Sequence, residues 1–190
     1  MKKPWLTFAG MCSVVLAIVL LSIIFGSYTS MLRSKSRVDT GKNLMAQACL
    51  DQLELVPQLV SLAPESFSGE AVSRIHDTAQ QLQKILDSFQ ATKVPLDPDL
   101  VAAFENMQAI LAKDLDALTT AIGKDHALSK EMYDRYLKII YSTKRYNKEA
   151  LYFATRKTVF PGFFTAKWFH LDELDFPRID LDCFHPWGLK

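Results

Sequence analysis

Histidine, cysteine and carboxylate side chains are the groups most able to do chemistry, and this 190-residue chain has 4 His, 3 Cys and 21 Asp and Glu. The most suggestive spacing is Asp182 with His185 beside Cys183, a set that can hold a metal ion, although a solvated, irregular tail is the interpretation we favour. No Glu is followed three residues later by His, which di-iron helical bundles require. The motifs H-E-x-x-H, C-x-x-C and G-x-S-x-G are absent as well. We therefore expect no catalytic site, no metal site and no cofactor.

Tyr146 and Asn147 form a pair that could bind without catalysing. They are neighbours in a strongly helical stretch, and the asparagine amide both donates and accepts hydrogen bonds. In a structural role, the tyrosine packs between helices and the asparagine bonds to another helix or to the backbone. In a functional role, the two residues form a polar notch that receives a partner. The sequence leaves both interpretations open.

A long apolar segment precedes these residues. Residues 6–25 form a 20-residue apolar run, and no charged residue or histidine occurs between positions 4 and 32. A 20-residue helix is about 30 Å long, the thickness of the hydrocarbon core of a bilayer. We predict a short flank at residues 1–5 and a single transmembrane anchor at 6–28. The alternative is a cleaved signal peptide, whose apolar region is normally about 7–15 residues.

Charges on the two sides of this segment bear on its orientation. Lys2, Lys3 and the amino terminus lie on one side. The other side carries four basic residues: Arg33, Lys35, Arg37 and Lys42. Because positive charge is retained in the cytoplasm, this count favours a cytoplasmic C-terminal domain. We expect the protein in the cell (inner) membrane.

Beyond the anchor, apolar residues recur at helical spacing in four stretches. The first stripe runs from residue 38 to residue 62 and contains Pro57. Proline removes one N–H and clashes with the preceding turn, so we expect a kink there and the end of the helix near Pro64. The other stripes occupy residues 72–89, 101–122 and 132–153.

Capping residues separate these stripes. Ser66 or Ser68 is suited to begin the second helix, and Asp97 followed by proline to begin the third. Pro161 and Gly162 are expected to end the fourth. Because the connections are short, we predict an all-α fold in which residues 29–160 form an antiparallel up-down four-helix bundle with long helices.

Residues 161–190 are predicted to be an aromatic and acidic C-terminal tail, since eight aromatic residues lie between positions 160 and 190. The fourth helix of such a bundle returns towards the membrane. We therefore expect four of these rings to dock at the headgroup boundary or against the base of the anchor: Phe163, Phe164, Trp168 and Phe169. In the alternative, the same rings cap the open end of the bundle core.

Several of these residues resemble the signature of LemA family proteins, which runs YNxxVxxYNxxIxxFP with an alanine five residues later. The positions that match in register are Tyr146, Asn147, Phe160, Pro161 and Ala166. The positions that depart from it are Ala150, Phe153, Ala154 and Lys157. Residues 55–60 are similar to the family's LIPNLV stretch, and residues 37–39 to its RxxVD stretch.

The resemblance covers about residues 5–169 and implies a single-pass, N-terminally anchored, antiparallel helical domain. It implies no established enzymatic activity. The motif residues that could bind a partner are Pro57, Tyr146, Asn147, Phe160 and Pro161.

The charge balance narrows the class of partner. The 22 basic and 21 acidic residues are dispersed along the chain, whereas nucleic-acid binders carry a clustered basic surplus, so we expect no nucleic acid. We expect a bacterial, membrane-anchored helical scaffold or interaction protein of the cell envelope, not an enzyme. Its partner would be an unidentified protein or a second copy. The alternative is a membrane-tethered ligand sensor that acts through a separate output partner.

Overall fold

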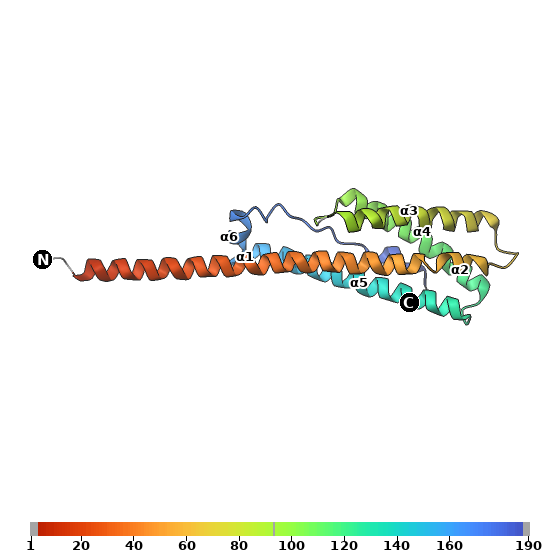
Figure 1. The fold of residues 1–190 in the computed structure, drawn as a ribbon, viewed down its shortest axis with the longest axis horizontal. Helices are drawn as coiled ribbons and strands as arrows, with labels where there is room; N and C mark the ends of the chain where they lie inside the picture. Colours follow the sequence, from red (N-terminus) through yellow and green to blue (C-terminus); the bar gives the residue numbers. More distant parts are fainter. Residues whose placement is uncertain (1–3, 93, 188–190) are drawn as a thin grey trace. The chain divides into compact units, whose positions relative to one another are not determined.

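The computed structural model of this chain describes residues 4–92 and 94–187, and the side chains of residues 10–92 and 94–184. Every regular element in that part is a helix (Figure 1). The elements are α1 (Pro4–Leu53), α2 (Val56–Ser61), α3 (Gly69–Ala91), α4 (Pro98–Ile122), α5 (Ala127–Thr158), α6 (Gly162–Trp168) and the 3-10 helix η1 (Leu181–Trp187). The all-α prediction is confirmed. Residues 1–3 of the predicted flank lie outside the described residues.

The chain forms two compact units. One consists of residues 1–36 and 151–175, and the other of residues 37–150 and 176–190. We call them the anchor unit and the helical unit. Both α1 and α5 pass from one unit into the other. These units reflect packing, whereas the predicted segments reflect composition, so their boundaries differ.

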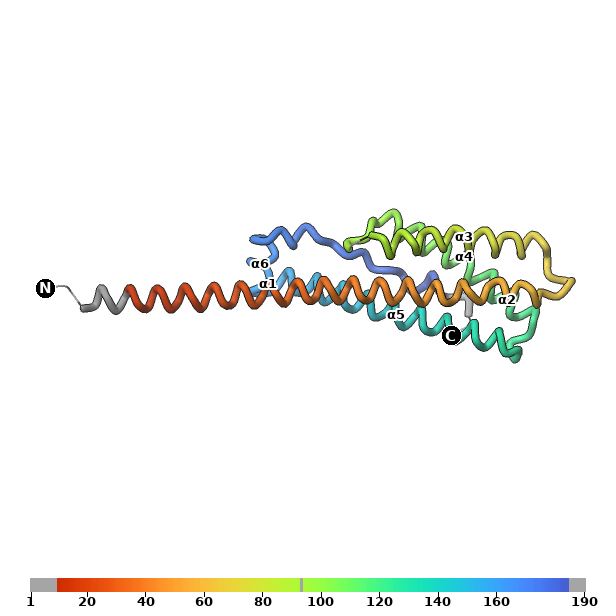
Figure 2. The backbone as a smooth tube through the Cα atoms, in the orientation of Figure 1, coloured from red at the N-terminus to blue at the C-terminus, as the bar shows by residue number. Residues whose placement is uncertain are grey.

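In the helical unit, the chain reverses direction between α1 and α3, between α3 and α4, and between α4 and α5 (Figure 1, Figure 2). Helix α3 packs along α4, and η1 also packs against α4. The predicted stripes supply most of the core. Their fully buried members include Val38, Met45, Leu59, Ile75, Leu82, Leu86, Phe89, Phe104, Leu111, Leu115, Leu118, Met132 and Ile139. Leu62, the last residue of the first stripe, is 40% exposed.

The ends of the helices follow local chemistry. The Asp97 side chain caps α4 by accepting a hydrogen bond from the N–H of Asp99 at 3.0 Å, and Pro98 occupies the first helical position. Ser68 is the N-cap residue of α3, but its hydroxyl makes no capping bond. Gly123 ends α4 with a φ of 111°, which an L side chain rarely adopts.

The first helix is interrupted just before Pro57. Helix α1 ends at Leu53, a turn follows, and α2 begins at Val56 with Pro57 in its first turn. Proline is tolerated there because the first N–H groups of a helix have no partner within it. The disturbance lies where the proline predicts it, and the end of α2 at Ser61 agrees with the expected stop near Pro64.

The predicted tail is more ordered than an irregular, solvated segment. It contains α6 and η1, and it buries Phe176, Ile179 and Phe184, which are 6%, 1% and 0% exposed. Several apolar residues of this segment lie in irregular backbone, so they show no helical period. The solvated, irregular interpretation that we favour for the segment around Asp182 does not hold for Cys183 and Phe184, which are buried in η1.

Candidate functional sites: a main-chain notch and an aromatic foot

Tyr146 lies on the buried face of α5 in the helical unit. Its side chain is fully buried, and its hydroxyl donates a hydrogen bond to the carbonyl oxygen of Pro177 at 2.9 Å. Gly41 of α1 lies directly against it, since a Cβ on Gly41 would stand 3.1 Å from the Tyr146 Cα. The close approach of α1 and α5 therefore depends on a residue without a side chain.

Asn147, the next residue on α5, binds the main chain of the tail. Its Nδ2 donates to the carbonyl oxygen of Ile179 at 2.7 Å, and its Oδ1 accepts from the N–H of Ile179 at 3.0 Å. One amide thus pairs with both main-chain groups of one residue, as a neighbouring strand would. We call Tyr146 and Asn147 the main-chain notch.

The segment held in the notch makes further contacts with α4. The Phe184 ring packs edge-on against Phe104, with centroids 6.3 Å apart. A carboxylate oxygen of Glu105 accepts a hydrogen bond from the N–H of Asp180 at 2.6 Å. The notch is therefore occupied by the chain's own tail, and the occupant lies 32 residues away from Asn147 in sequence.

Burial around this segment suppresses ionisation. It raises the pKa of the Cys49 thiol, an effect reinforced by Cys183, and it raises the pKa of Cys183 to about 12, with Glu105 adding to the effect. Burial also raises the pKa of Tyr136 to about 12. Both cysteines are free, and their thiols stay protonated and unreactive near neutral pH.

Pro57 does not belong to the notch. It is exposed on α2, where it lines a shallow groove with residues of α3 such as His76 and Gln80. Phe160 and Pro161 belong to the anchor unit. The five motif residues therefore do not form one site. Of the five, Tyr146 and Asn147 together form the main-chain notch.

Five aromatic residues of the anchor unit are exposed around α6. Phe160, at 72%, and Trp168, at 68%, are the most exposed. We call the set the aromatic foot: Phe160, Phe163, Phe164, Trp168 and Phe169. The Phe164 ring contacts Phe160 and Phe163 edge-on, with centroids 6.2 and 5.5 Å away. Each of the five residues keeps at least 43% of its surface exposed.

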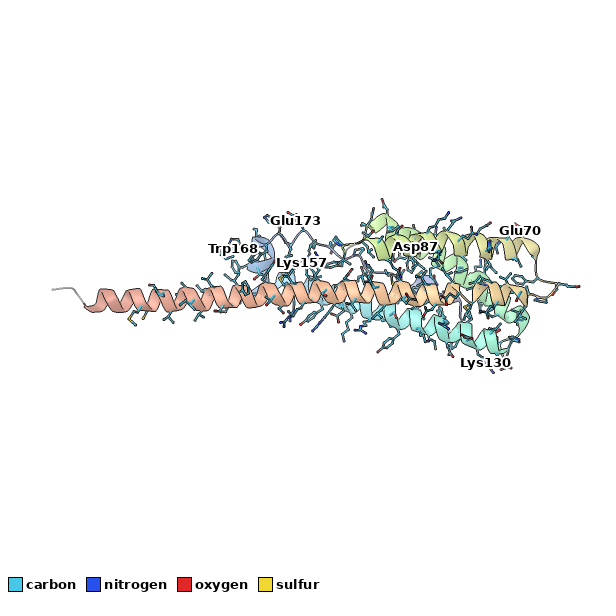
Figure 3. The ribbon with its side chains drawn as sticks, viewed as in Figure 1. Glu70, Asp87, Lys130, Lys157, Trp168 and Glu173 are labelled. Carbon is cyan, nitrogen blue, oxygen red and sulfur yellow. The ribbon has the colours of Figure 1, made fainter. Side chains whose placement is uncertain are left out.

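Contacts within the anchor unit fix the foot beside α1. Phe169 packs on Tyr28 of α1 with ring centroids 4.3 Å apart. The Arg156 guanidinium donates to the hydroxyl groups of Ser30 and Tyr152. Lys157 donates to two main-chain carbonyls of the segment after α6, at 3.1 and 2.5 Å (Figure 3). The end of α5 is thereby joined both to α1 and to the chain that follows the foot.

Gly162 makes the turn into α6 possible. A Cβ at this position would overlap the carbonyl oxygen of Arg156. Pro161 is the N-cap residue of α6, and Gly162 is its first residue. The glycine of the Phe-Pro-Gly sequence therefore leaves the space that α6 needs to fold back against the last turn of α5.

Helix α1 supplies the apolar part of the anchor unit. Among the described residues, it is the one helix long and apolar enough to cross a membrane, with a mean hydropathy of 2.4 over its most apolar 18-residue window. None of that window is buried against the rest of the chain. Its side chains are therefore exposed to whatever solvent surrounds the protein.

A pocket at the turn between α4 and α5 is the feature that a ligand sensor would use. It encloses about 380 Å³ and is lined by residues that include Lys124, Lys130 and Asp134. Ser129 also lines this pocket, and its hydroxyl is buried without a hydrogen-bond partner. Over residues 10–92 and 94–184, no group of three potential metal ligands gathers.

Comparisons with known proteins found no relative: no family model, curated protein or solved structure matches this chain. The LemA resemblance rests on the motif residues, and it stays a prediction.

Proposed function

We propose that this protein is a non-catalytic, membrane-anchored interaction protein of the cell envelope, with a helical domain of the LemA type. The observation that carries the proposal is the wholly exposed apolar window of α1. An exposed apolar stretch of 18 residues is unfavourable in water and favourable in a bilayer. Because α1 continues without interruption into the helical unit, the same helix would tether that unit to the membrane.

The finer architecture in this proposal is an antiparallel up-down bundle of α1, α3, α4 and α5. Three reversals of the chain and the packing of α3 along α4 support it. The predicted stripes supply buried residues to all four helices. Such a bundle offers long, rigid faces, which suit a scaffold.

The positions that resemble the LemA signature have physical roles that support this assignment. Tyr146 and Asn147 hold extended main chain against α5, and Phe160 and Pro161 lead into the turn that places α6 beside α1. The motif thus ties the end of the bundle to the segment that follows it. The flanking charges favour a helical unit on the cytoplasmic side of the inner membrane.

The experiment that tests the proposal is crosslinking in native membranes followed by mass spectrometry of the full-length protein. We expect a stable partner protein crosslinked to exposed lysines of α5, such as Lys138 or Lys148. A matched sample solubilised and diluted before crosslinking should lose that partner. Recovery of self-contacts alone would assign the role to a homo-oligomer. Recovery of neither would contradict an interaction role.

A further inference from the structure

An apolar groove lies between α1 and the foot in the anchor unit. Its walls include Leu21, Ile24, Phe25 and Gly26 of α1, and Trp168 and Phe169 at the end of α6. It encloses about 800 Å³, within the range of roughly 300–1,000 Å³ that is typical of small-molecule sites. We propose that this groove binds one acyl chain of a bilayer phospholipid. This inference rests on the proposed membrane anchoring of α1.

The lining chemistry suits a hydrocarbon chain. Among the lining residues, Ser22 carries a hydroxyl, which already donates to the carbonyl oxygen of Ile18 at 2.8 Å. The groove therefore offers no unpaired hydroxyl donor to a polar ligand. Gly26 leaves its floor open, because nothing lies within 4 Å of the place a Cβ would take.

The position of the groove along α1 determines what can fill it. Leu21 to Gly26 lie at the end of the apolar run, and the first charged residue after that run is Arg33. Arg33 is seven positions after Gly26, about 10 Å along a helix. In a membrane spanned by α1, the groove thus lies below the charged headgroups, where there is no water to occupy it.

Exposure of the foot points to the same occupant. Trp168 and Phe169 keep 68% and 43% of their surface exposed while they flank the groove. Tryptophan at the headgroup level is favourable, since its ring is apolar and its N–H is polar. The Phe169 contact with Tyr28 holds the foot close enough to α1 to form the second wall. A lipid chain filling the groove would have protein on both sides and the bilayer on the open side.

The test uses the full-length protein in phosphatidylcholine vesicles that contain a phosphatidylcholine with a photoactivatable diazirine in its acyl chain. Labelled residues are identified by mass spectrometry. We expect Phe25 and Trp168 to be labelled several-fold more than Val15, an exposed residue of the same helix. The variant Gly26→Leu should fill the groove and reduce that labelling to the level of Val15. The matched control is Gly10→Leu, which also enters open space on α1 and should leave the pattern unchanged.

Other outcomes separate failure of the groove from failure of the anchor. If Val15 is labelled but Phe25 and Trp168 are labelled no more strongly, then the groove holds no lipid chain and the anchor stands. If Val15 is not labelled, the proposed anchoring itself is wrong. If labelling at Trp168 persists unchanged in Gly26→Leu, the lipid contacts the outer face of the foot and the groove is not the binding site. Circular dichroism would show that each variant keeps its helices.

Discussion

Replacing Asn147 with alanine should release the tail from the helical unit. The amide makes two hydrogen bonds to the main chain of Ile179, which is 1% exposed. Without the amide, one buried N–H and one buried C=O lose their partners. An unpaired buried group costs about 1–3 kcal/mol, and because Asn147 is only half-buried, some water can enter. We therefore expect a loss of about 2–4 kcal/mol in the free energy of unfolding.

The assay for Asn147→Ala is urea unfolding of the full-length protein in detergent micelles, combined with hydrogen exchange of residues 176–184. Faster exchange in that segment should accompany the lower stability. The neighbouring variant Lys148→Ala removes an exposed side chain and should stay within about 0.5 kcal/mol of the wild type. The variant Asn147→Asp keeps the acceptor but sets a carboxylate against the Ile179 carbonyl, so it should also destabilise. If Asn147→Ala unfolds like the wild type and its tail stays protected, the notch does not hold the tail.

Three further predictions concern packing and pH. Gly162→Ala should loosen α6, because the added Cβ has no space, and hydrogen exchange in α6 should become faster. The control is Gly69→Ala, whose Cβ enters open space and should leave exchange in its helix unchanged. Gln52 and Gln108 form a buried pair that shares one hydrogen bond of 3.3 Å and leaves one donor and one acceptor unpaired. Replacing both with leucine should therefore leave the free energy of unfolding unchanged or raise it. Replacing only one should lower the free energy of unfolding, measured in urea, by about 1–3 kcal/mol. Stability should fall as the pH rises from about 8 to 10, because the buried Cys49 thiol has a raised pKa and the unfolded chain loses that proton first. Cys49→Ala should reduce this dependence on pH by up to about 1.4 kcal/mol per pH unit. A free energy of unfolding that rises in the wild type as the pH increases from 8 to 10 would contradict the burial of this thiol.

The helices were predictable because each buries one face. A one-sided core imposes a period near 3.6 residues, and Leu82, Phe104 and Ile139 follow it and are fully buried. Asp97 could be recognised as a cap because the preference is local. For Pro57, local chemistry predicted a disturbance of the helix, and the two-residue interruption before Val56 lies at that place.

The tail and its notch could not be predicted in the same way. Phe176 and Ile179 lie in irregular backbone and Phe184 in a 3-10 helix, where burial leaves no regular spacing. The pairing of Asn147 with Ile179 joins residues 32 positions apart, and nothing in either local sequence specifies the other. The one available signal was the presence of large apolar residues in a segment too acidic to form a core alone. The foot was predictable as a set of residues, but its contact with Tyr28 required the fold.

Extraction of native membranes with alkaline carbonate tests the central claim most directly, combined with the intact mass of the protein that stays with the lipid. We expect the full-length chain, with Met1 or its processed amino terminus followed by the apolar run, to remain in the membrane pellet. A peripheral protein would be released under these conditions. Recovery of a soluble species that begins near Ser30 would contradict the account, because it would make the apolar segment a cleaved signal rather than an anchor.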